Sequence, residues 1–305
     1  MPTLEQYRGC LLGLALGDAL GAPYEGGLIE RLLWRAIGST RVGQMRWTDD
    51  TQMAIDLVES FLSEGTINPD DLAMRFARSY RWSRGYGPGA ARVLKRIARG
   101  IDWREANCSV YPEGSFGNGA AMRVPMLGLI FGDHADELAE MVRSSAIVTH
   151  AHPVAVEGAL LVALVAGLVA RGHSPGEIYG RATGWCSLSQ FQTRLTTARE
   201  WELSAETPSP GEVARALGRG IAAHESCVTG VYLALRFQNQ AFLEMQRFIA
   251  AGGGDVDTIG AMAGAIWGAS NGVARLPDDA LAILEQRERL DGLAVSLHEM
   301  RASHA

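Results

Sequence analysis

The chain has 305 residues, of which 47% are hydrophobic and 20% charged, and this composition is typical of a soluble globular protein. A net charge of −6, without a dense stripe of lysine and arginine, argues against a general nucleic-acid-binding protein. No Pro- or Ser-rich linker interrupts the sequence, so we expect one domain over residues 1–305.

The N-terminus lacks the basic-then-apolar pattern of a signal peptide. The most apolar stretch, Val154 to Ala170, contains Glu157 and is shorter than the roughly 18 to 20 residues that a membrane span needs. We therefore expect a cytoplasmic monomer without a membrane segment, in which this stretch is a core helix. Free thiols in a reducing compartment are expected because the four cysteines do not have the spacing of a zinc site. They are Cys10, Cys108, Cys186 and Cys227.

The first predicted helix begins at a capping box formed by Thr3 and Gln6, and its leucines and alanines indicate that it is largely buried. We expect it to end in the segment Gly17 to Gly26, where glycines and a proline favour a loop. Asp18 in this segment is interpreted as a local helix cap. Glu25 lies between an aromatic residue and a glycine pair without an obvious local partner, so we predict that it reaches a ligand.

Three oxygen-bearing residues, Thr48, Asp49 and Asp50, stand at the start of the next predicted helix, whose apolar stripe includes Met53 and Leu57. Capping is the alternative interpretation. One capping residue is enough for a helix end, however, so capping does not account for all three. We interpret them as one wall of a metal site.

Two glycine-rich segments, Arg84 to Ala91 and Ser115 to Arg123, each precede a predicted helix rich in small residues. Free N–H groups at a helix start bind phosphate well, and we predict this role for both segments. An ordinary turn is the alternative in each case.

Thr149, His150 and His152 precede the apolar core helix. Two histidines at a helix entrance indicate that at least one contacts a ligand, although Thr149 and His152 also fit as helix caps. No strand pattern of useful length appears. Further helices are predicted at Leu72 to Tyr80, Pro175 to Tyr179, Phe191 to Leu203, Gly211 to Leu217 and Val228 to Leu235, and in a charged tail from Asp279 to Arg301. The predicted fold is all-α, with many helices around a buried central one.

A second acidic cluster, made of Asp255, Asp257 and Thr258, follows three consecutive glycines at the start of a helix rich in Ala and Gly. Two carboxylates this close repel each other unless a cation lies beside them. Helix capping is again the alternative. Hard oxygen ligands suit Mg²⁺, Mn²⁺ or Ca²⁺ rather than zinc. The early and late clusters together predict the two walls of a dinuclear metal site.

With these residues in place, the sequence resembles the ADP-ribosylglycohydrolase family. The paired motifs Thr-Asp-Asp-Thr and Asp-x-Asp-Thr are together highly specific. The matching segments, in family order along nearly the whole chain, are Gly17 to Gly21, Trp47 to Thr51, Arg84 to Gly89, Ser115 to Arg123, Thr149 with His150, and Gly253 to Thr258.

The resemblance implies a compact all-α fold with a central cleft that holds two Mg²⁺ or Mn²⁺ ions. It implies that the first acidic cluster faces the second around the metals, with ligands from Thr48, Asp49, Asp50, Asp255, Asp257 and Thr258. It also implies substrate contacts from the glycine-rich segments and the first histidine, namely Gly87, Gly89, Ser115, Gly117, Asn118, Gly119 and His150.

The reaction implied is hydrolysis of the glycosidic bond between ADP-ribose and a protein side chain such as arginine or serine, which reverses ADP-ribosylation. Glu25 and Asp50 are the candidates for the group that accepts the proton of the attacking water. Two alternatives remain open, namely hydrolysis of a free ADP-ribose conjugate and binding of ADP-ribose without catalysis. The acceptor stays open because this chain lacks the acid that some relatives carry in the loop Arg84 to Gly89 and has His152 where many carry an aspartate.

Overall fold

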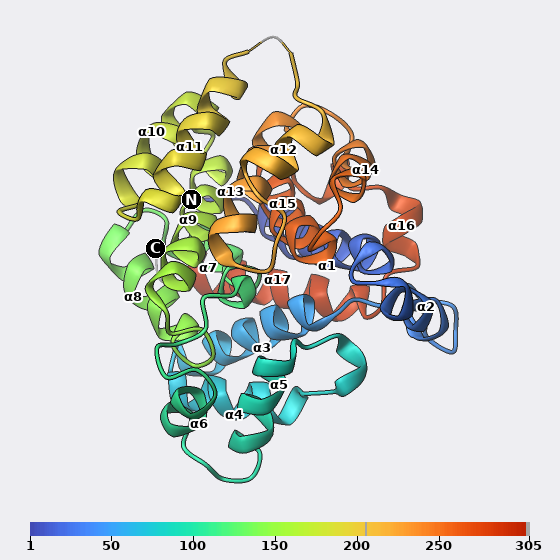
Figure 1. Cartoon of the computed structure of the whole chain (residues 1–305), viewed down its shortest axis with the longest axis vertical. Coiled ribbons are helices and arrows are strands. Elements are labelled where there is room, and N and C mark those ends of the chain that lie inside the picture. Colours follow the sequence, from blue (N-terminus) through green and yellow to red (C-terminus); the bar gives the residue numbers. More distant parts are fainter. Residues whose placement is uncertain (205, 303–305) are drawn as a thin grey trace.

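The computed structural model describes residues 1–204 and 206–302. Within these ranges the chain forms seventeen α-helices, four short 3₁₀ turns and no β-strand (Figure 1), so the predicted all-α fold is confirmed.

The helices before residue 150 are α1 (Leu4–Gly21), α2 (Leu28–Ile37), α3 (Asp49–Glu64), α4 (Pro69–Ser79), α5 (Pro88–Ile97), α6 (Trp103–Val110), α7 (Pro125–Phe131) and α8 (Ala135–Ala146). Those after it are α9 (Pro153–Ala170), α10 (Pro175–Trp185), α11 (Ser189–Glu202), α12 (Pro210–Ala216), α13 (Ala223–Arg236), α14 (Phe242–Gly252), α15 (Val256–Asn271), α16 (Asp278–Ala282) and α17 (Arg287–Ala302). The 3₁₀ turns are η1 (Ala22–Tyr24), η2 (Trp82–Arg84), η3 (Asn118–Ala120) and η4 (Val273–Arg275).

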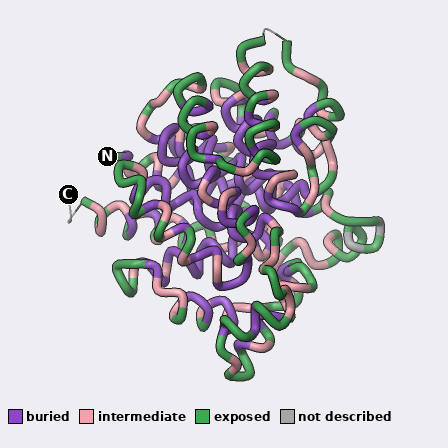
Figure 2. Tube along the Cα trace, turned by 60° about the vertical axis from the view of Figure 1, so that its left-hand side comes forward, coloured by how far each residue is buried: buried purple, intermediate pink, exposed green. Residues whose placement is uncertain are grey.

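Three helices, α1, α9 and α15, form much of the buried interior that Figure 2 shows in purple. α9 has the length and mean hydropathy of a membrane span, 18 residues and 2.2, but 83% of it is buried inside the protein. It is the predicted core helix. The prediction of one central helix is incomplete, because α15 is buried continuously from Val256 to Ala269 and lies against α1.

Four helices, α2, α6, α8 and α14, have no counterpart among the predicted elements. α2 is the most peripheral of them and projects at the right of Figure 1. Its apolar side chains are largely exposed, with Ile29 79% and Leu32 60% accessible. α6, α8 and α14 have clear apolar faces but are short or interrupted by charged residues.

α1 and α15 meet backbone to backbone, along two rows of glycines spaced four residues apart. The rows are Gly9, Gly13, Gly17 and Gly21 on α1, and Gly260, Gly264, Gly268 and Gly272 in and directly after α15. A Cβ atom on Gly13 would lie 2.3 Å from the carbonyl oxygen of Gly264, and one on Gly17 would lie 2.1 Å from that of Gly260. Neither distance is sterically possible, so the contact between the helices depends on glycine.

α1 ends at Gly21, within the predicted segment Gly17 to Gly26, and this contact explains why the helix continues through Gly17. Glycine inside a helix costs about 1 kcal/mol relative to alanine, and the close packing of the two helices offsets that cost here. Asp18 therefore lies on a helix and not in a loop. A Cβ on Gly21 would lie 2.5 Å from the Cα of Asp257, so the contact brings the carboxyl end of α1 to the amino end of α15.

Carboxylates of other helices accept hydrogen bonds at the start of α3 and in the segment directly before α11. The Asp18 carboxylate accepts hydrogen bonds from the N–H groups of Thr48, at 2.9 Å, and Thr51, at 3.0 Å, at the start of α3. The Glu157 carboxylate of α9 accepts bonds from the N–H groups of Ser187 and Leu188 before α11. Asp18 is thus a cap, but the prediction of a local one is wrong. It caps a helix about 30 residues away because the folded chain brings the two ends together.

We predict that Gly13→Ala lowers the free energy of unfolding by about 2 to 3 kcal/mol, because the new methyl group overlaps the Gly264 carbonyl. Gly180→Ala, on the exposed face of α10 with no other atom within 4 Å, is the matched control. It should stabilise the protein by about 0.5 to 1 kcal/mol through helix propensity. Urea unfolding of both variants measures the two effects. If both substitutions changed the free energy of unfolding by similar, small amounts, α1 and α15 would not be in backbone contact.

Candidate active site

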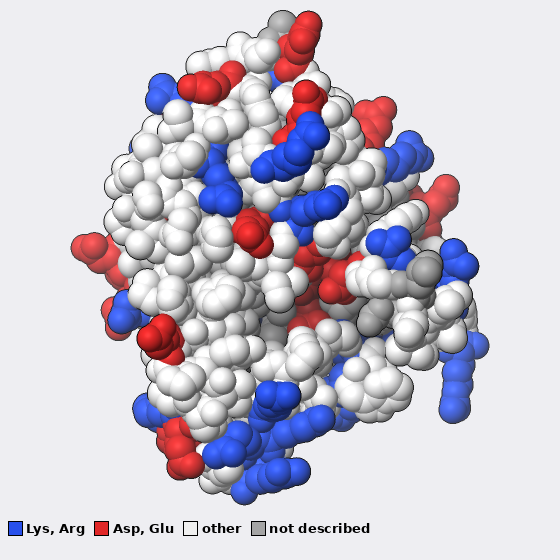
Figure 3. All heavy atoms as spheres, in the orientation of Figure 1, with Lys and Arg blue, Asp and Glu red and all other residues white. Residues whose placement is uncertain are grey.

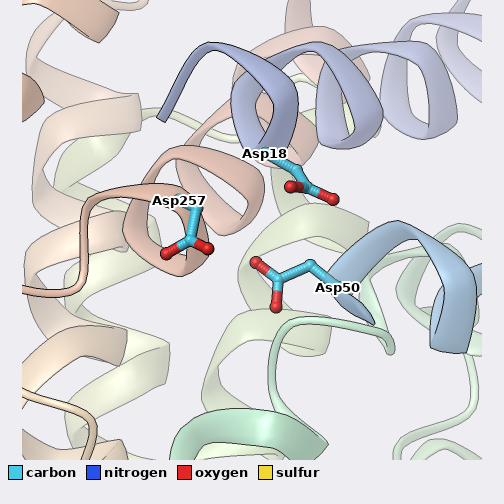
Figure 4. A group of neighbouring side chains, drawn as sticks. All are labelled: Asp18, Asp50 and Asp257. Atoms are coloured by element: carbon cyan, nitrogen blue, oxygen red, sulfur yellow. The ribbon is translucent and has the colours of Figure 1, made fainter. Parts of the chain in front are cut away.

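Three carboxylates from three helices converge at the end of the contact between α1 and α15. They belong to Asp18 near the end of α1, Asp50 in the first turn of α3 and Asp257 in the first turn of α15. One oxygen atom of each lies within 4.8 Å of the others. Figure 4 shows the three side chains turned toward a common space. All three are buried.

A second group of three shares Asp257 with the first. Glu25, which follows η1, and Asp255, at the start of α15, each place a carboxylate oxygen within 4.8 Å of Asp257 and of each other. We call the five residues together the acid cluster. It consists of Asp18, Glu25, Asp50, Asp255 and Asp257.

Two side chains outside the acid cluster orient its members. The Asn118 amide donates hydrogen bonds to Asp255 Oδ2 and, at 2.9 Å, to Ser226 Oγ, so it holds Asp255 in place. The Thr258 hydroxyl donates to Asp50 Oδ1 at 3.3 Å and thereby joins the starts of α3 and α15.

The acidic motif at α15 does not cap the helix, so the alternative interpretation of this motif is wrong. Asp255 occupies the N-cap position, but its side chain makes no capping hydrogen bond. The Asp257 carboxylate accepts a bond from the N–H of Thr258 at 2.9 Å and otherwise faces the cluster. At α3 the capping interpretation holds for one residue. The Thr48 hydroxyl accepts a bond from the N–H of Asp50 at 3.3 Å, as an N-cap does.

The predicted metal ligands are therefore distributed unevenly. Asp50, Asp255, Asp257 and Thr258 come together, and Asp49 lines the same cavity without entering either group of three. Thr48 lies behind them with its hydroxyl used for capping, and it does not line the cavity.

Asp18 is the member that the sequence prediction of ligands missed. The available signal was a single acid within the apolar and glycine-rich run from Cys10 to Gly21.

The acid cluster carries more negative charge than the surrounding protein neutralises. Among the described residues, no lysine or arginine forms an ion pair with any of its carboxylates. Asp50 Oδ2 is buried without a hydrogen-bond partner there. Burial raises the pKa of Asp18 to about 6 and, with the nearby Glu25, that of Asp255 to about 7. Burial, and then the neighbouring acids, also raise the pKa values of Asp50 and Asp257 well above their ordinary value.

Buried, mutually repelling carboxylates with an unused oxygen are the donor set that a hard divalent cation requires. The side chains present therefore fit a metal ion, and Asp257 belongs to both groups of three.

The acid cluster opens into a cavity of about 180 Å³. Figure 3 shows acidic side chains at the floor of a hollow on this face of the molecule. Its other walls include the two glycine-rich segments, the first histidine of the pair and Tyr111, which the sequence analysis missed. The predicted substrate residues that line the cavity are Gly87, Gly89, Ser115, Gly117, Asn118, Gly119 and His150.

The two glycine-rich segments differ in local structure. Gly87 precedes α5, whose first residue is Pro88, as predicted for a helix start that binds phosphate. Ser115 to Arg123 forms only the turn η3 before α7 begins at Pro125, so the predicted small-residue helix is wrong. Glycine is needed in both places by close approach. A Cβ on Gly89 would overlap Tyr111, and one on Gly119 would lie 2.5 Å from His150 Cε1.

A largely buried ion pair positions the first of these segments. Arg84 donates to both carboxylate oxygens of Glu285, at 2.7 and 2.9 Å, and to the carbonyl of Trp47, at 2.7 Å. Its guanidinium also lies 3.5 Å from the centre of the Trp47 ring. The residues that follow Arg84 and Trp47 are the cavity loop and the acidic start of α3, so this one contact fixes the two walls relative to each other.

The two histidines have separate roles. His152 caps α9, because its Nδ1 accepts a hydrogen bond from the N–H of Val154 at 3.2 Å. Its ring packs edge to face against the exposed Phe116 at the edge of the site. His150 lines the cavity beside Gly117 and Gly119.

Comparison with known proteins agrees with this geometry. Residues 1–305 match the family model described as ADP-ribosylglycohydrolase. The protein named ADP-ribosylhydrolase ARH3 of Homo sapiens is 33% identical over 98% of this chain and 94% of its own length, and its namesake of Danio rerio is 32% identical over 97% and 91%. A solved structure described as an ADP-ribosylglycohydrolase-related protein complex matches with a TM-score of 0.70 and 28% identity over 98% of each chain.

An all-α fold with a carboxylate-lined cleft and these similarities defines a hydrolase of ADP-ribose linkages. The chain belongs to the ADP-ribosylglycohydrolase family, as its motifs implied.

We predict that the metal-free protein loses stability as the pH rises from about 5 to 7.5. The pKa of Asp255 is about 7 in the folded chain and 3.8 as its ordinary value, so the folded state binds more protons in this window and ionisation opposes folding. Asp255→Asn removes this cost. In a chelator it should unfold with a free energy on the order of 2 kcal/mol higher than wild type at pH 7.5, and with a smaller difference at pH 5.

Urea unfolding at both pH values, with EDTA and then with excess Mg²⁺, measures this. Added Mg²⁺ should stabilise the wild type more at pH 7.5 than at pH 5, because the ion binds ionised carboxylates. The account would be contradicted if, in EDTA, the free energy of unfolding of the wild type rose relative to that of Asp255→Asn as the pH increased.

Proposed function

We propose that this protein is a metal-dependent glycosidase that removes ADP-ribose from a modified protein side chain such as arginine or serine, with two Mg²⁺ or Mn²⁺ ions held by the acid cluster. The observation that carries the proposal is the pair of carboxylate groups that share Asp257 at the floor of the cavity. Ions bound there would orient the ribose hydroxyls and lower the pKa of a bound water molecule. Their ligands would come from Asp18, Asp49, Asp50, Asp255, Asp257 and Thr258, with Thr48 behind them.

The cavity walls suit the remainder of the substrate. The N–H groups at the start of α5 and in the turn Gly117 to Gly119 are placed for a diphosphate. Tyr111 offers an aromatic face for a base or a sugar. A protein with a net charge of −6 thus receives an anion through N–H groups and cations, without a basic surface at this site.

Cleavage at the anomeric carbon develops oxocarbenium character, and a carboxylate must accept the proton of the attacking water. Glu25 is the first candidate for this base, because it is half-exposed at the cavity while its oxygen lies beside Asp255 and Asp257. Asp50, buried and with one unpartnered oxygen, is the second.

The substrate class is tested by incubating the protein and Mg²⁺ with serine-linked and arginine-linked ADP-ribosyl peptides and a small ADP-ribose conjugate in parallel. Mass spectrometry identifies the products. Release of ADP-ribose from a peptide supports the proposal. Turnover of the small conjugate alone supports the free-conjugate alternative, and binding of ADP-ribose without turnover of any substrate supports a non-catalytic protein.

Asp257→Asn should abolish the thermal stabilisation by Mg²⁺ or Mn²⁺ and lower turnover by more than about 100-fold, because both carboxylate groups lose their shared member. The matched control is Asp279→Asn, an exposed acid on α16. Metal-dependent melting curves and initial rates measure the effect. Wild-type turnover by Asp257→Asn in the presence of EDTA would exclude the metal mechanism.

Glu25→Gln should reduce turnover by about 10²- to 10⁴-fold if Glu25 is the base, and change ADP-ribose affinity little. Single-turnover kinetics separate the chemical step from binding, and Glu113→Gln, another exposed acid, serves as the control. A single-turnover rate within about twofold of wild type would transfer the base role to Asp50.

A further inference from the structure

Arg123 is the largest charged side chain in the interior and has 0% of its surface exposed. Its guanidinium donates to Ser145 Oγ at 3.1 Å, to the Ser145 carbonyl at 2.6 Å and to the Gly119 carbonyl at 3.0 Å. Among the described residues it forms no ion pair with a carboxylate. Burial lowers the pKa of Arg123 to about 9, which still leaves the group charged at neutral pH. Burying a charged group without an ion-pair partner costs free energy, and packing alone does not compensate for this cost. The buried charge therefore indicates a further role for Arg123.

The same guanidinium reaches the cavity through two further side chains. Its Nη1 donates to Thr149 Oγ1 at 3.0 Å, and Thr149 Oγ1 lies 2.8 Å from His150 Nδ1. Thr149 is 1% exposed, and these are the two hydrogen-bond partners of its hydroxyl in the described part of the chain. His150 Nε2, on the far side of the ring, has no hydrogen-bond partner there and lies beside Gly117 and Gly119 at the cavity wall.

The direction of these bonds follows from counting donors. A guanidinium only donates, so the Thr149 hydroxyl accepts from Arg123 and has a single hydrogen of its own to give. The imidazole Nδ1 is the acceptor within reach, and a protonated Nδ1 would leave the buried hydroxyl hydrogen without a partner. Nδ1 is therefore unprotonated, and the proton of the neutral ring is on Nε2.

We infer that Arg123 and Thr149 are positioning residues that hold His150 as the Nε2–H tautomer, so that the ring presents a fixed hydrogen-bond donor to an oxygen atom of the bound ADP-ribose. This inference rests on the function proposed above. It adds that the cavity wall at Gly117 to Gly119 carries a hydrogen-bond donor, which selects an acceptor such as a phosphate or ribose oxygen. Burial, followed by the nearby Arg123, lowers the pKa of His150 to about 3, in keeping with a neutral ring.

The experiment compares two variants of Thr149 that differ in the hydroxyl. Thr149→Val keeps the shape and removes the hydrogen bonds, whereas Thr149→Ser keeps them. Long-range ¹H–¹⁵N spectra of protein labelled with ¹⁵N-histidine report which ring nitrogen carries the proton, and His150→Gln assigns the signal. Calorimetry with ADP-ribose in the presence of Mg²⁺ measures affinity on the same samples.

The wild type and Thr149→Ser should show a protonated Nε2 and a bare Nδ1 from pH 5 to 8. Thr149→Val should lose this single tautomer and about five- to tenfold of its ADP-ribose affinity, with Mg²⁺ binding unchanged. A merely structural role would lower the melting temperature and leave the tautomer and the affinity of the folded protein as they are.

The inference is overturned if wild-type His150 carries its proton on Nδ1, if it titrates near its ordinary pKa, or if Thr149→Val keeps both tautomer and affinity. These outcomes are distinct from failure of the proposed function, which would appear as a wild type that binds no ADP-ribose at all.

Discussion

The backbone contact between α1 and α15 is the constraint on which the site depends. With hydrogen atoms in place of side chains, the two helices approach until the carbonyl oxygens of one fill the space where the other would carry Cβ atoms. Asp18 and Asp257 lie at the end of this contact, and Asp18 then captures the N–H groups at the start of α3 and brings Asp50 with it. Helix packing thus delivers three carboxylates to one point, and no loop has to position them.

Such an arrangement is unfavourable by itself. Burial raises the pKa values of these acids because an ionised carboxylate loses its hydration, and each neighbouring acid adds repulsion. The two buried arginines are bonded to groups outside the acid cluster: Arg84 is paired with Glu285, and Arg123 is bonded to carbonyls and hydroxyls. Both guanidiniums nevertheless serve the cavity, the first by fixing the loop after Gly85 and the second through Thr149 and His150. In the proposed function the negative charge is left for divalent ions, and the positive charge holds the walls of the cavity.

Much of the site could be predicted because its chemistry is locally dense. Asp49 and Asp50, and Asp255 and Asp257, are acids at helix starts in numbers that capping does not require, and the motifs identify the family. Asp18 could not be assigned in this way, since a single acid after a glycine resembles a helix end. Only the spacing of four between Gly9, Gly13, Gly17 and Gly21 indicates that the helix continues, and its register against α15 is not encoded in either segment alone. The pair Arg84 and Glu285 spans 201 residues, so sequence patterns do not reveal it. Thr48 shows that a residue of the motif can also cap the helix that follows it.

The central claim is that this helix contact creates a site for two divalent ions that share Asp257. Crystals grown with Mn²⁺ and measured at the manganese absorption edge test it directly, because the anomalous signal locates the metal independently of any assumption about ligands. The account predicts two peaks, one among Asp18, Asp50 and Asp257 and one beside Asp255 and Asp257. A cleft without a peak at millimolar Mn²⁺, or ions bound only elsewhere on the molecule, would contradict it.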